Sequence, residues 1–130
     1  MSEKRWKLRL KSFDKAVSNL LKYKDNVLAD ELSKAGFIQL FEIAMELCWK
    51  TLKDYLESES GIMVNSPKET IRSAFQCGVV QDGDILLKAL QARNLTSHIY
   101  SEDVTEEIIC EIRENYIVCI VETLENLKQD

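Results

Sequence analysis

The residue types best suited to chemistry lie together in one short stretch, residues 93–100, which we call the motif segment. It holds an arginine, an asparagine, two hydroxyl side chains, the only histidine of the chain and a tyrosine. Arginine neutralises phosphate oxygens with a planar fork of donors. A histidine near its ordinary pKa can take a proton from a ribose 2′-hydroxyl or give one to a leaving oxygen. Arg93 and His98 therefore indicate chemistry on a phosphodiester, and RNA can be cleaved in this way without a metal.

Helix geometry complicates this interpretation of the motif segment. Successive residues of a helix turn by about 100°, so Arg93 and His98 are separated by about 140° around a straight helix. Either the helix bends or ends here, or two copies of the segment meet across a dimer and complete each other's site. A structural role, in which His98 and Tyr100 satisfy local carbonyls and Arg93 pairs with a neighbouring acid, explains the residue types better, because so short a spacing is weak support for a site.

The rest of the chain predicts a single all-α domain over residues 1–130, an up-down antiparallel bundle of four to five helices. No stretch has the pattern of a strand long enough to pair in a sheet. Ser66 and Glu69 form a capping box around a proline at the first helical position, and Gly78 marks the end of that helix. We expect helices over roughly 3–26, 30–59 and 66–78, a fourth from about residue 82 into the motif segment, and a fifth to the C-terminus after a polar break at 101–105.

Several smaller features carry expectations of their own. Gly36, inside the second helix, is typical of a close approach between helices. Glu42 and Glu46 predict a solvent-exposed stripe on the second helix, in which the two glutamates form ion pairs with Lys50 and Lys53. The aromatic residues at helical spacing, such as Phe41 and Trp49, are assigned to the core or to a dimer contact.

Composition and missing motifs exclude several classes of protein. The chain has 45% hydrophobic and 30% charged residues, a globular balance with no apolar run long enough for a membrane helix and no signal-peptide pattern, so we expect a cytoplasmic protein. No phosphate-binding glycine loop is present, and we expect no cofactor. One histidine and no paired cysteines make a metal site a poor hypothesis. The four cysteines, expected to be small buried hydrophobes, are Cys48, Cys77, Cys110 and Cys119.

Charge is divided unevenly along the chain. The net charge is −5, which argues against loose binding of nucleic acid. Residues 1–26 hold eight Lys/Arg and three Asp/Glu (8 − 3 = +5), and residues 99–130 hold two and nine (2 − 9 = −7). Either two solvated faces of opposite sign pack side by side, or a basic face serves RNA and an acidic face a basic partner.

The motif segment resembles the signature of HEPN domains, an arginine followed by a polar residue with a histidine five positions on. The added Tyr100 resembles the HepT-like branch, whose members are typically encoded beside a minimal nucleotidyltransferase (MNT). Residues 37–104 are closely similar to the group called nucleotidyltransferase substrate-binding proteins. The stretches that carry this similarity are 41–42, 46–47, 49–53, 66–69, 74–75 and 93–98.

The resemblance implies a fold and a mechanism. HEPN bundles generally form homodimers in which both motifs face one cleft, and catalytic members are metal-independent endoribonucleases that leave a cyclic phosphate. Carried over here, His98 would be the general base or acid, Arg93 would hold the scissile phosphate and Asn94 would position the segment. In HepT-like toxins of toxin–antitoxin pairs, the partner MNT neutralises the protein by adding AMP to the motif tyrosine, here Tyr100.

Two other functions stay open. The chain could be a non-catalytic subunit that presents a substrate to the nucleotidyltransferase, with Arg93 and His98 as ligand contacts. It could also be a structural helical adaptor, in which case His98→Ala would change stability alone.

Overall fold

The computed structural model describes residues 4–96 and 102–129, and helices make up nearly all of them. None of these described residues lies in a strand, so the predicted all-α bundle is confirmed. No helix among them is both long enough and apolar enough to cross a membrane. In chain order the elements are α1 (Arg5–Lys22), α2 (Glu31–Tyr55), η1 (Leu56–Ser60), α3 (Pro67–Gln76), α4 (Gly83–Leu95), α5 (Glu102–Glu111), η3 (Ile112–Tyr116) and α6 (Ile117–Lys128), where η1 and η3 are single π-helical turns.

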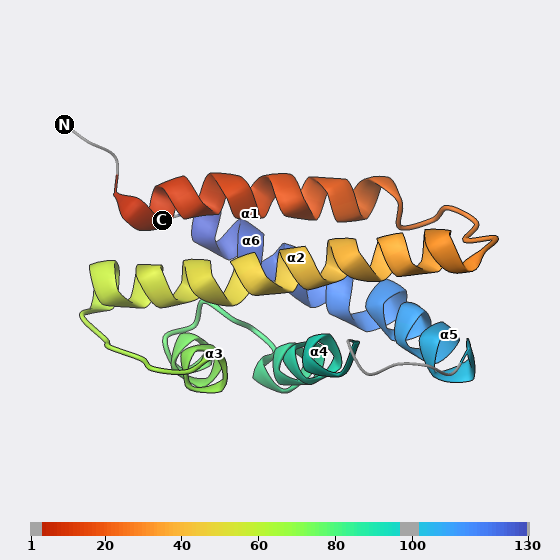
Figure 1. The fold of residues 1–130 in the computed structure, drawn as a ribbon. Helices are drawn as coiled ribbons and strands as arrows, with labels where there is room; N and C mark the ends of the chain where they lie inside the picture. Colours follow the sequence, from red (N-terminus) through yellow and green to blue (C-terminus); the bar gives the residue numbers. More distant parts are fainter. Residues whose placement is uncertain (1–3, 97–101, 130) are drawn as a thin grey trace.

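Two long helices form the centre of the bundle. α1 and α2 run antiparallel side by side, and α2 lies between α1 and the short pair α3 and α4 (Figure 1). α5, η3 and α6 follow one another without interruption and cross behind α1 and α2. Figure 1 looks nearly along the axes of α3 and α4, so these two helices cross α2 steeply.

The core is made of large side chains from all three long helical segments. Phe41 of α2 has no exposed surface and stacks on Tyr116 of η3, with 5.9 Å between ring centroids. Trp6 of α1 meets Tyr55 of α2 edge to face at 5.0 Å. Phe41 is therefore a core residue, as expected, whereas Trp49 is only half buried.

Local signals at the helix ends behave largely as the sequence predicts. The Ser66 side chain accepts a hydrogen bond from the Glu69 backbone N–H at 3.1 Å, and the Glu69 carboxylate accepts one from the Asn65 N–H at 3.2 Å. Gly78 has φ +82°, the left-handed conformation that glycine adopts without strain after a helix. α5, however, begins at Glu102, so the expected polar break at 101–105 is shorter. Acidic residues in the first helical turn, here Glu102 and Asp103, favour this early start.

Two other expectations are wrong. A Cβ at Gly36 would meet nothing within 4 Å, because Gly36 lies on the exposed side of α2, and Gly36 marks no close approach between helices. Cys48 and Cys119 are buried, and burial raises the pKa of both thiols, that of Cys119 to about 12. Cys77 and Cys110 are exposed, because Cys77 caps the end of α3 and Cys110 lies on the outer side of α5.

The oppositely charged ends of the chain pack against each other. α6 contacts α1, and Lys128 lies 3.4 Å from the Asp14 carboxylate. Arg113 of η3 donates a hydrogen bond to the Asn26 carbonyl at 2.7 Å. The two charged regions therefore lie on helices that pack against each other in one domain.

Candidate functional site

Arg93 is presented at the C-terminal end of α4. The helix starts at the N-cap Asp82, whose carboxylate accepts a hydrogen bond from the Ile85 N–H at 3.0 Å. Leu86 and Ala89 are fully buried and fix the inner side of α4. The helix dipole places partial negative charge at its C-terminal end and favours a cation there. α4 therefore holds Arg93 on a rigid element, where its guanidinium can reach α2.

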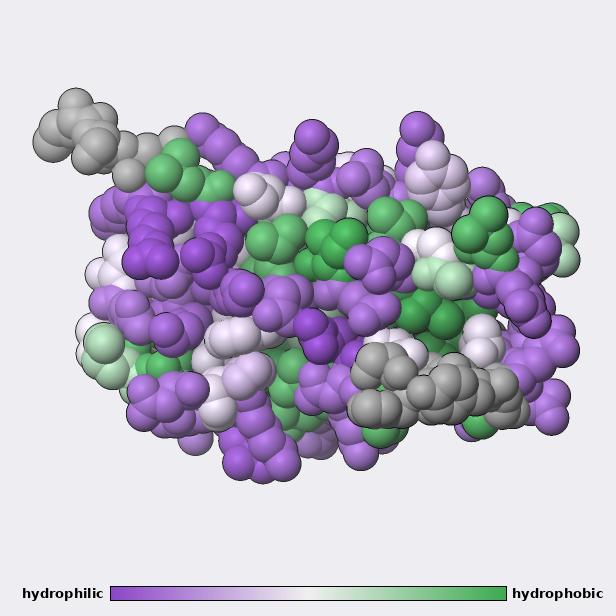
Figure 2. Space-filling view, in the orientation of Figure 1, coloured by the Kyte–Doolittle hydropathy of each residue, from purple (hydrophilic) through white to green (hydrophobic). Residues whose placement is uncertain are grey.

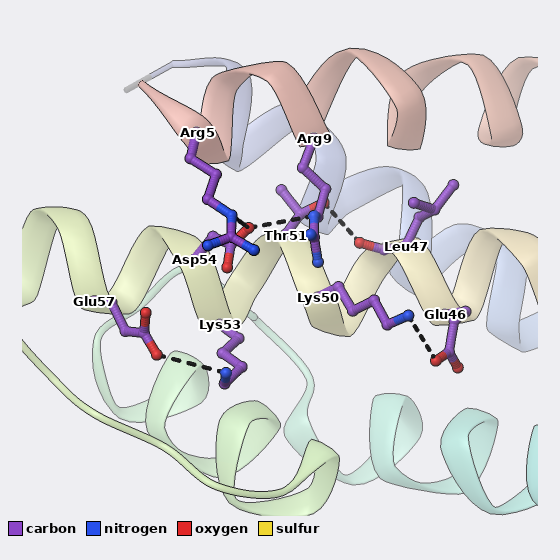
Figure 3. A network of polar contacts seen from close by, with 9 residues as sticks. All are labelled: Arg5, Arg9, Glu46, Leu47, Lys50, Thr51, Lys53, Asp54 and Glu57. Atoms are coloured by element: carbon purple, nitrogen blue, oxygen red, sulfur yellow. Dashed lines mark hydrogen bonds and ion pairs between the residues drawn. The ribbon is translucent and has the colours of Figure 1, made fainter. Parts of the chain in front are cut away.

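The acid that Arg93 meets is Glu46. An Nη of Arg93 lies 3.1 Å from Glu46 Oε2, and Lys50 Nζ lies 3.3 Å from Glu46 Oε1, so each carboxylate oxygen holds one cation. Figure 3 shows Glu46 and Lys50 one turn apart on α2. The Arg93 and Glu46 side chains are about one third exposed, at 34% and 31%. Glu46 thus joins α2 to the start of the motif segment.

The Arg93 guanidinium is not fully used by this ion pair. Its Nε is buried and has no hydrogen-bond partner among the described residues. A guanidinium carries five N–H donors and no acceptor, and this side chain is one third exposed, so an anion is the natural ligand for the donors that face solvent. Phosphate oxygens fit such a planar group well.

The sequence prediction for Glu46 is confirmed only in part. Lys50 answers Glu46 as expected, but Lys53 pairs with Glu57 at 3.6 Å instead. The contact between Glu46 and Arg93 was missed, although pairing of Arg93 with a neighbouring acid was one alternative. The only local signal was a glutamate and a lysine at helical spacing, and nothing in it specifies the approach of α4.

Further ion pairs continue along the same face of the molecule. Asp54 of α2, whose side chain is 10% exposed, lies 3.2 Å from Arg9 Nε and 3.8 Å from Arg5 Nε. These pairs, together with Lys53 and Glu57, form a row across α1 and α2 (Figure 3). Most of the cations on this face therefore already form ion pairs with acidic side chains.

Asn94 lies on a different side of α4 from Arg93. Its exposed side chain lines a groove of about 400 Å³ between α3 and α4, whereas Arg93 contacts α2. The Thr96 hydroxyl donates a hydrogen bond to the Arg93 carbonyl at 2.7 Å, where α4 ends. The structure brings Arg93 to Glu46 but does not bring Asn94 to the same spot.

The other two predicted site residues, His98 and Tyr100, lie outside the described residues. Their position relative to Arg93 therefore stays a prediction. The expected bend or end of the helix within the motif segment, and the alternative of a site completed by a second copy of the chain, also stay predictions. Among residues 4–96 and 102–129, no group of three or more His, Cys, Asp or Glu side chains could hold a metal ion.

An apolar stripe follows the outer side of α2 toward Arg93. Leu32 and Ile43 are 81% and 42% exposed, and Leu40 and Leu47, on the same side of the helix, are half buried. Leu95, directly after the Arg93-Asn94 pair, is 51% exposed. Hydrophobic residues gather in the middle and right of the face seen in Figure 2, interrupted by hydrophilic ones. An exposed apolar stripe on a rigid helix is typical of a surface that another protein chain covers.

Comparison with known proteins places this architecture among solved relatives. A family model described as "Nucleotidyltransferase substrate binding protein like" matches residues 8–129. A crystal structure of a protein from Thermus thermophilus is 28% identical, with a TM-score of 0.82 over 89% of this chain and 98% of that one. A chain in the crystal structure of a mutant of the toxin–antitoxin MntA–HpeT is 13% identical, with a TM-score of 0.79 over 96% and 98%, and shares the fold. The search of curated proteins finds no match.

Proposed function

Because the chain belongs to the nucleotidyltransferase substrate-binding protein-like family, we propose that it is the HepT-like component of a two-component module with a minimal nucleotidyltransferase, and that it is a metal-independent endoribonuclease. The observation that carries this proposal is the placement of Arg93. Its guanidinium is held at one nitrogen by Glu46, its side chain is one third exposed, and it lies at the end of α4, five positions before His98 in the sequence.

The proposed reaction assigns one task to each residue. His98 takes the proton from the ribose 2′-hydroxyl, and the 2′-oxygen attacks the adjacent phosphorus. The 5′-oxygen of the next nucleotide leaves and takes a proton from solvent water, so that a 2′,3′-cyclic phosphate and a 5′-hydroxyl result, and His98 returns its proton to solvent. Arg93 balances the charge that builds up on the phosphate oxygens. Asn94, on the other side of α4, positions the segment.

A homodimer completes the proposal. The apolar stripe of α2 and Leu95 is exposed in the single chain, and a second copy would remove it from water. Since this stripe runs toward Arg93, a dimer built on it would bring two motif segments close together. In such a dimer, Arg93 of one copy and His98 of the other could act on the same phosphate, although the two residues would lie on different sides of one straight helix.

Control of the activity is assigned to Tyr100. The partner nucleotidyltransferase would join the phenol oxygen to the α-phosphate of ATP and release pyrophosphate. The added AMP would place a bulky anion two residues from His98, blocking the site by size and repelling RNA by charge.

The proposal is tested with total cellular RNA in EDTA. Wild type and His98→Ala are purified, and intact mass confirms that Tyr100 carries no adduct. We expect wild type to cleave RNA and His98→Ala to lose the activity while keeping its unfolding midpoint. No cleavage by adduct-free wild type would contradict the ribonuclease proposal.

The second candidate is a binding subunit that presents a substrate to the nucleotidyltransferase, and the description of the matched family favours it. It predicts no cleavage by the chain alone. It also predicts that Arg93→Ala lowers the activity of the two-protein complex by raising KM for the substrate and leaving kcat unchanged.

A further inference from the structure

The groove between α3 and α4 has the residues of an anion site. It has a volume of about 400 Å³, within the usual range for a small ligand. Lys88, Gln91 and Asn94 follow one another at three-residue spacing along the outer side of α4, and Lys68 stands opposite them in the first turn of α3. Two ammonium groups and two amides therefore line one depression.

These lysines are not used within the bundle. Neither Lys68 nor Lys88 forms an ion pair with any residue of 4–96 or 102–129, although Asp84 lies one turn before Lys88 on the same helix. Cations elsewhere on the surface, such as Lys50 and Arg9, are paired with acids. Lys68 and Lys88 share one groove, and neither charge is neutralised there by an ion pair with a described residue.

Among residues 4–96 and 102–129, no acidic side chain lines this groove to offset the two charges. The depression at the other end of the same two helices differs, since Asp82 and Asp84 lie there beside Arg72. The positive sign is thus a property of the end of the α3–α4 pair that holds Asn94, next to Arg93 in the chain.

We propose that this groove binds the phosphates of an RNA strand that flank the scissile one, with Lys68 and Lys88 as the phosphate contacts and Asn94 at the boundary with the cleavage site. This proposal rests on the ribonuclease function proposed above. From Lys88 to Asn94 the helix rises about 9 Å, so side chains along this side of α4 can contact more than one phosphate of an RNA strand. Gln91 and Asn94 can donate to phosphate or sugar oxygens, so the groove reads the backbone and not the base.

The test measures binding of a fluorescent single-stranded RNA to the His98→Ala protein, which does not cleave it. Each lysine that neutralises a phosphate contributes about 0.7 to the slope of log K against log salt. Adding Lys68→Ala and Lys88→Ala should therefore weaken binding and lower that slope by about 1.4. The matched control removes the exposed Lys15 and Lys22 of α1, which α2 separates from the groove, and should leave the slope nearly unchanged.

Cleavage by the same lysine variants in the wild-type background separates the two proposals. We expect KM for RNA to rise and kcat to stay, because the lysines bind away from the reacting phosphate. If wild type cleaves RNA but the Lys68/Lys88 variant shows an unchanged KM and salt slope, the groove proposal is wrong and the ribonuclease stands. If wild type neither binds nor cleaves RNA, both fail. Binding of AMP alone, lost in the Lys68/Lys88 variant while RNA binding persists, would overturn the assignment to RNA.

Discussion

The contact between Glu46 and Arg93 makes a prediction that can be checked with and without an activity. Glu46→Ala removes the only acid that an ion pair joins to Arg93 among the described residues. The pair is close, at 3.1 Å, but both side chains are about one third exposed. A partly solvated pair of this kind is worth about 0.5–1 kcal/mol. A double-mutant cycle with Glu46→Ala and Arg93→Ala, followed by urea unfolding, should give a coupling energy in that range.

The same contact should matter for cleavage. If Glu46 holds the guanidinium where the phosphate binds, losing about 1 kcal/mol of that restraint corresponds to a fall of about five-fold in kcat/KM. Single-turnover cleavage of RNA measures it directly. Lys50→Met should have a smaller effect, because Lys50 holds the other carboxylate oxygen and leaves the Arg93 contact in place.

The matched control is Glu57→Ala. Glu57 is also 31% exposed and also pairs with a lysine one turn away, at 3.6 Å, but it has no ion pair with Arg93. It should leave cleavage unchanged. The reasoning is refuted if the Glu46 cycle shows no coupling, or if Glu46→Ala cleaves RNA faster than wild type, because the carboxylate would then compete with RNA instead of positioning Arg93.

Three further predictions concern the fold that holds the site. Phe41→Ala should lower the free energy of unfolding by about 3–5 kcal/mol in urea titrations, because the ring is fully buried and stacked on Tyr116; a loss below about 1 kcal/mol would contradict this packing. Ser66→Ala should cost about 1 kcal/mol in the same assay by removing the N-cap of α3, and an unchanged midpoint would speak against that cap. Hydrogen bonds from the Ser33 side chain and backbone lower the pKa of Asp30, so the stability contributed by this carboxylate is present above its unfolded pKa of about 3.9 and is lost as pH falls through the lower folded value. Urea midpoints measured from about pH 5 to pH 2 should therefore fall less steeply for Asp30→Ala than for wild type.

The helices and their ends could be predicted from the sequence because their causes are local. Apolar residues at three- and four-residue spacing assigned Phe41 to the core or a dimer contact, and it lies in the core. The order serine, proline, glutamate marked the start of α3 near Ser66. The ends of the helices were harder to predict where the same residue type is common both in loops and in the first turn of a helix. Acidic residues at 102–103 suggested a loop, but they also favour the first turn of a helix, and α5 starts there.

The site was harder to predict because it depends on contacts between helices. Nothing near Glu46 in the sequence indicates that α4 brings Arg93 to it, and the groove of Lys68 and Lys88 exists only where α3 packs beside α4. The wrong expectations for Cys77 and Gly36 have the same origin. A residue type gives a tendency toward burial or close packing, and the arrangement of helices decides which side of each helix is covered.

The central claim, that the motif segment cleaves RNA through the ribose 2′-hydroxyl, is tested most directly with one pair of oligonucleotides. An RNA that wild type cuts at one position is compared in EDTA with the same RNA carrying a single 2′-deoxy residue just before that position, using adduct-free wild type, Arg93→Ala and His98→Ala. We predict that only wild type cuts, only the all-ribose strand is cut, and the product ends in a 2′,3′-cyclic phosphate. Cleavage of the deoxy-substituted strand at the same bond, or equal cleavage of the RNA by His98→Ala, would contradict this mechanism.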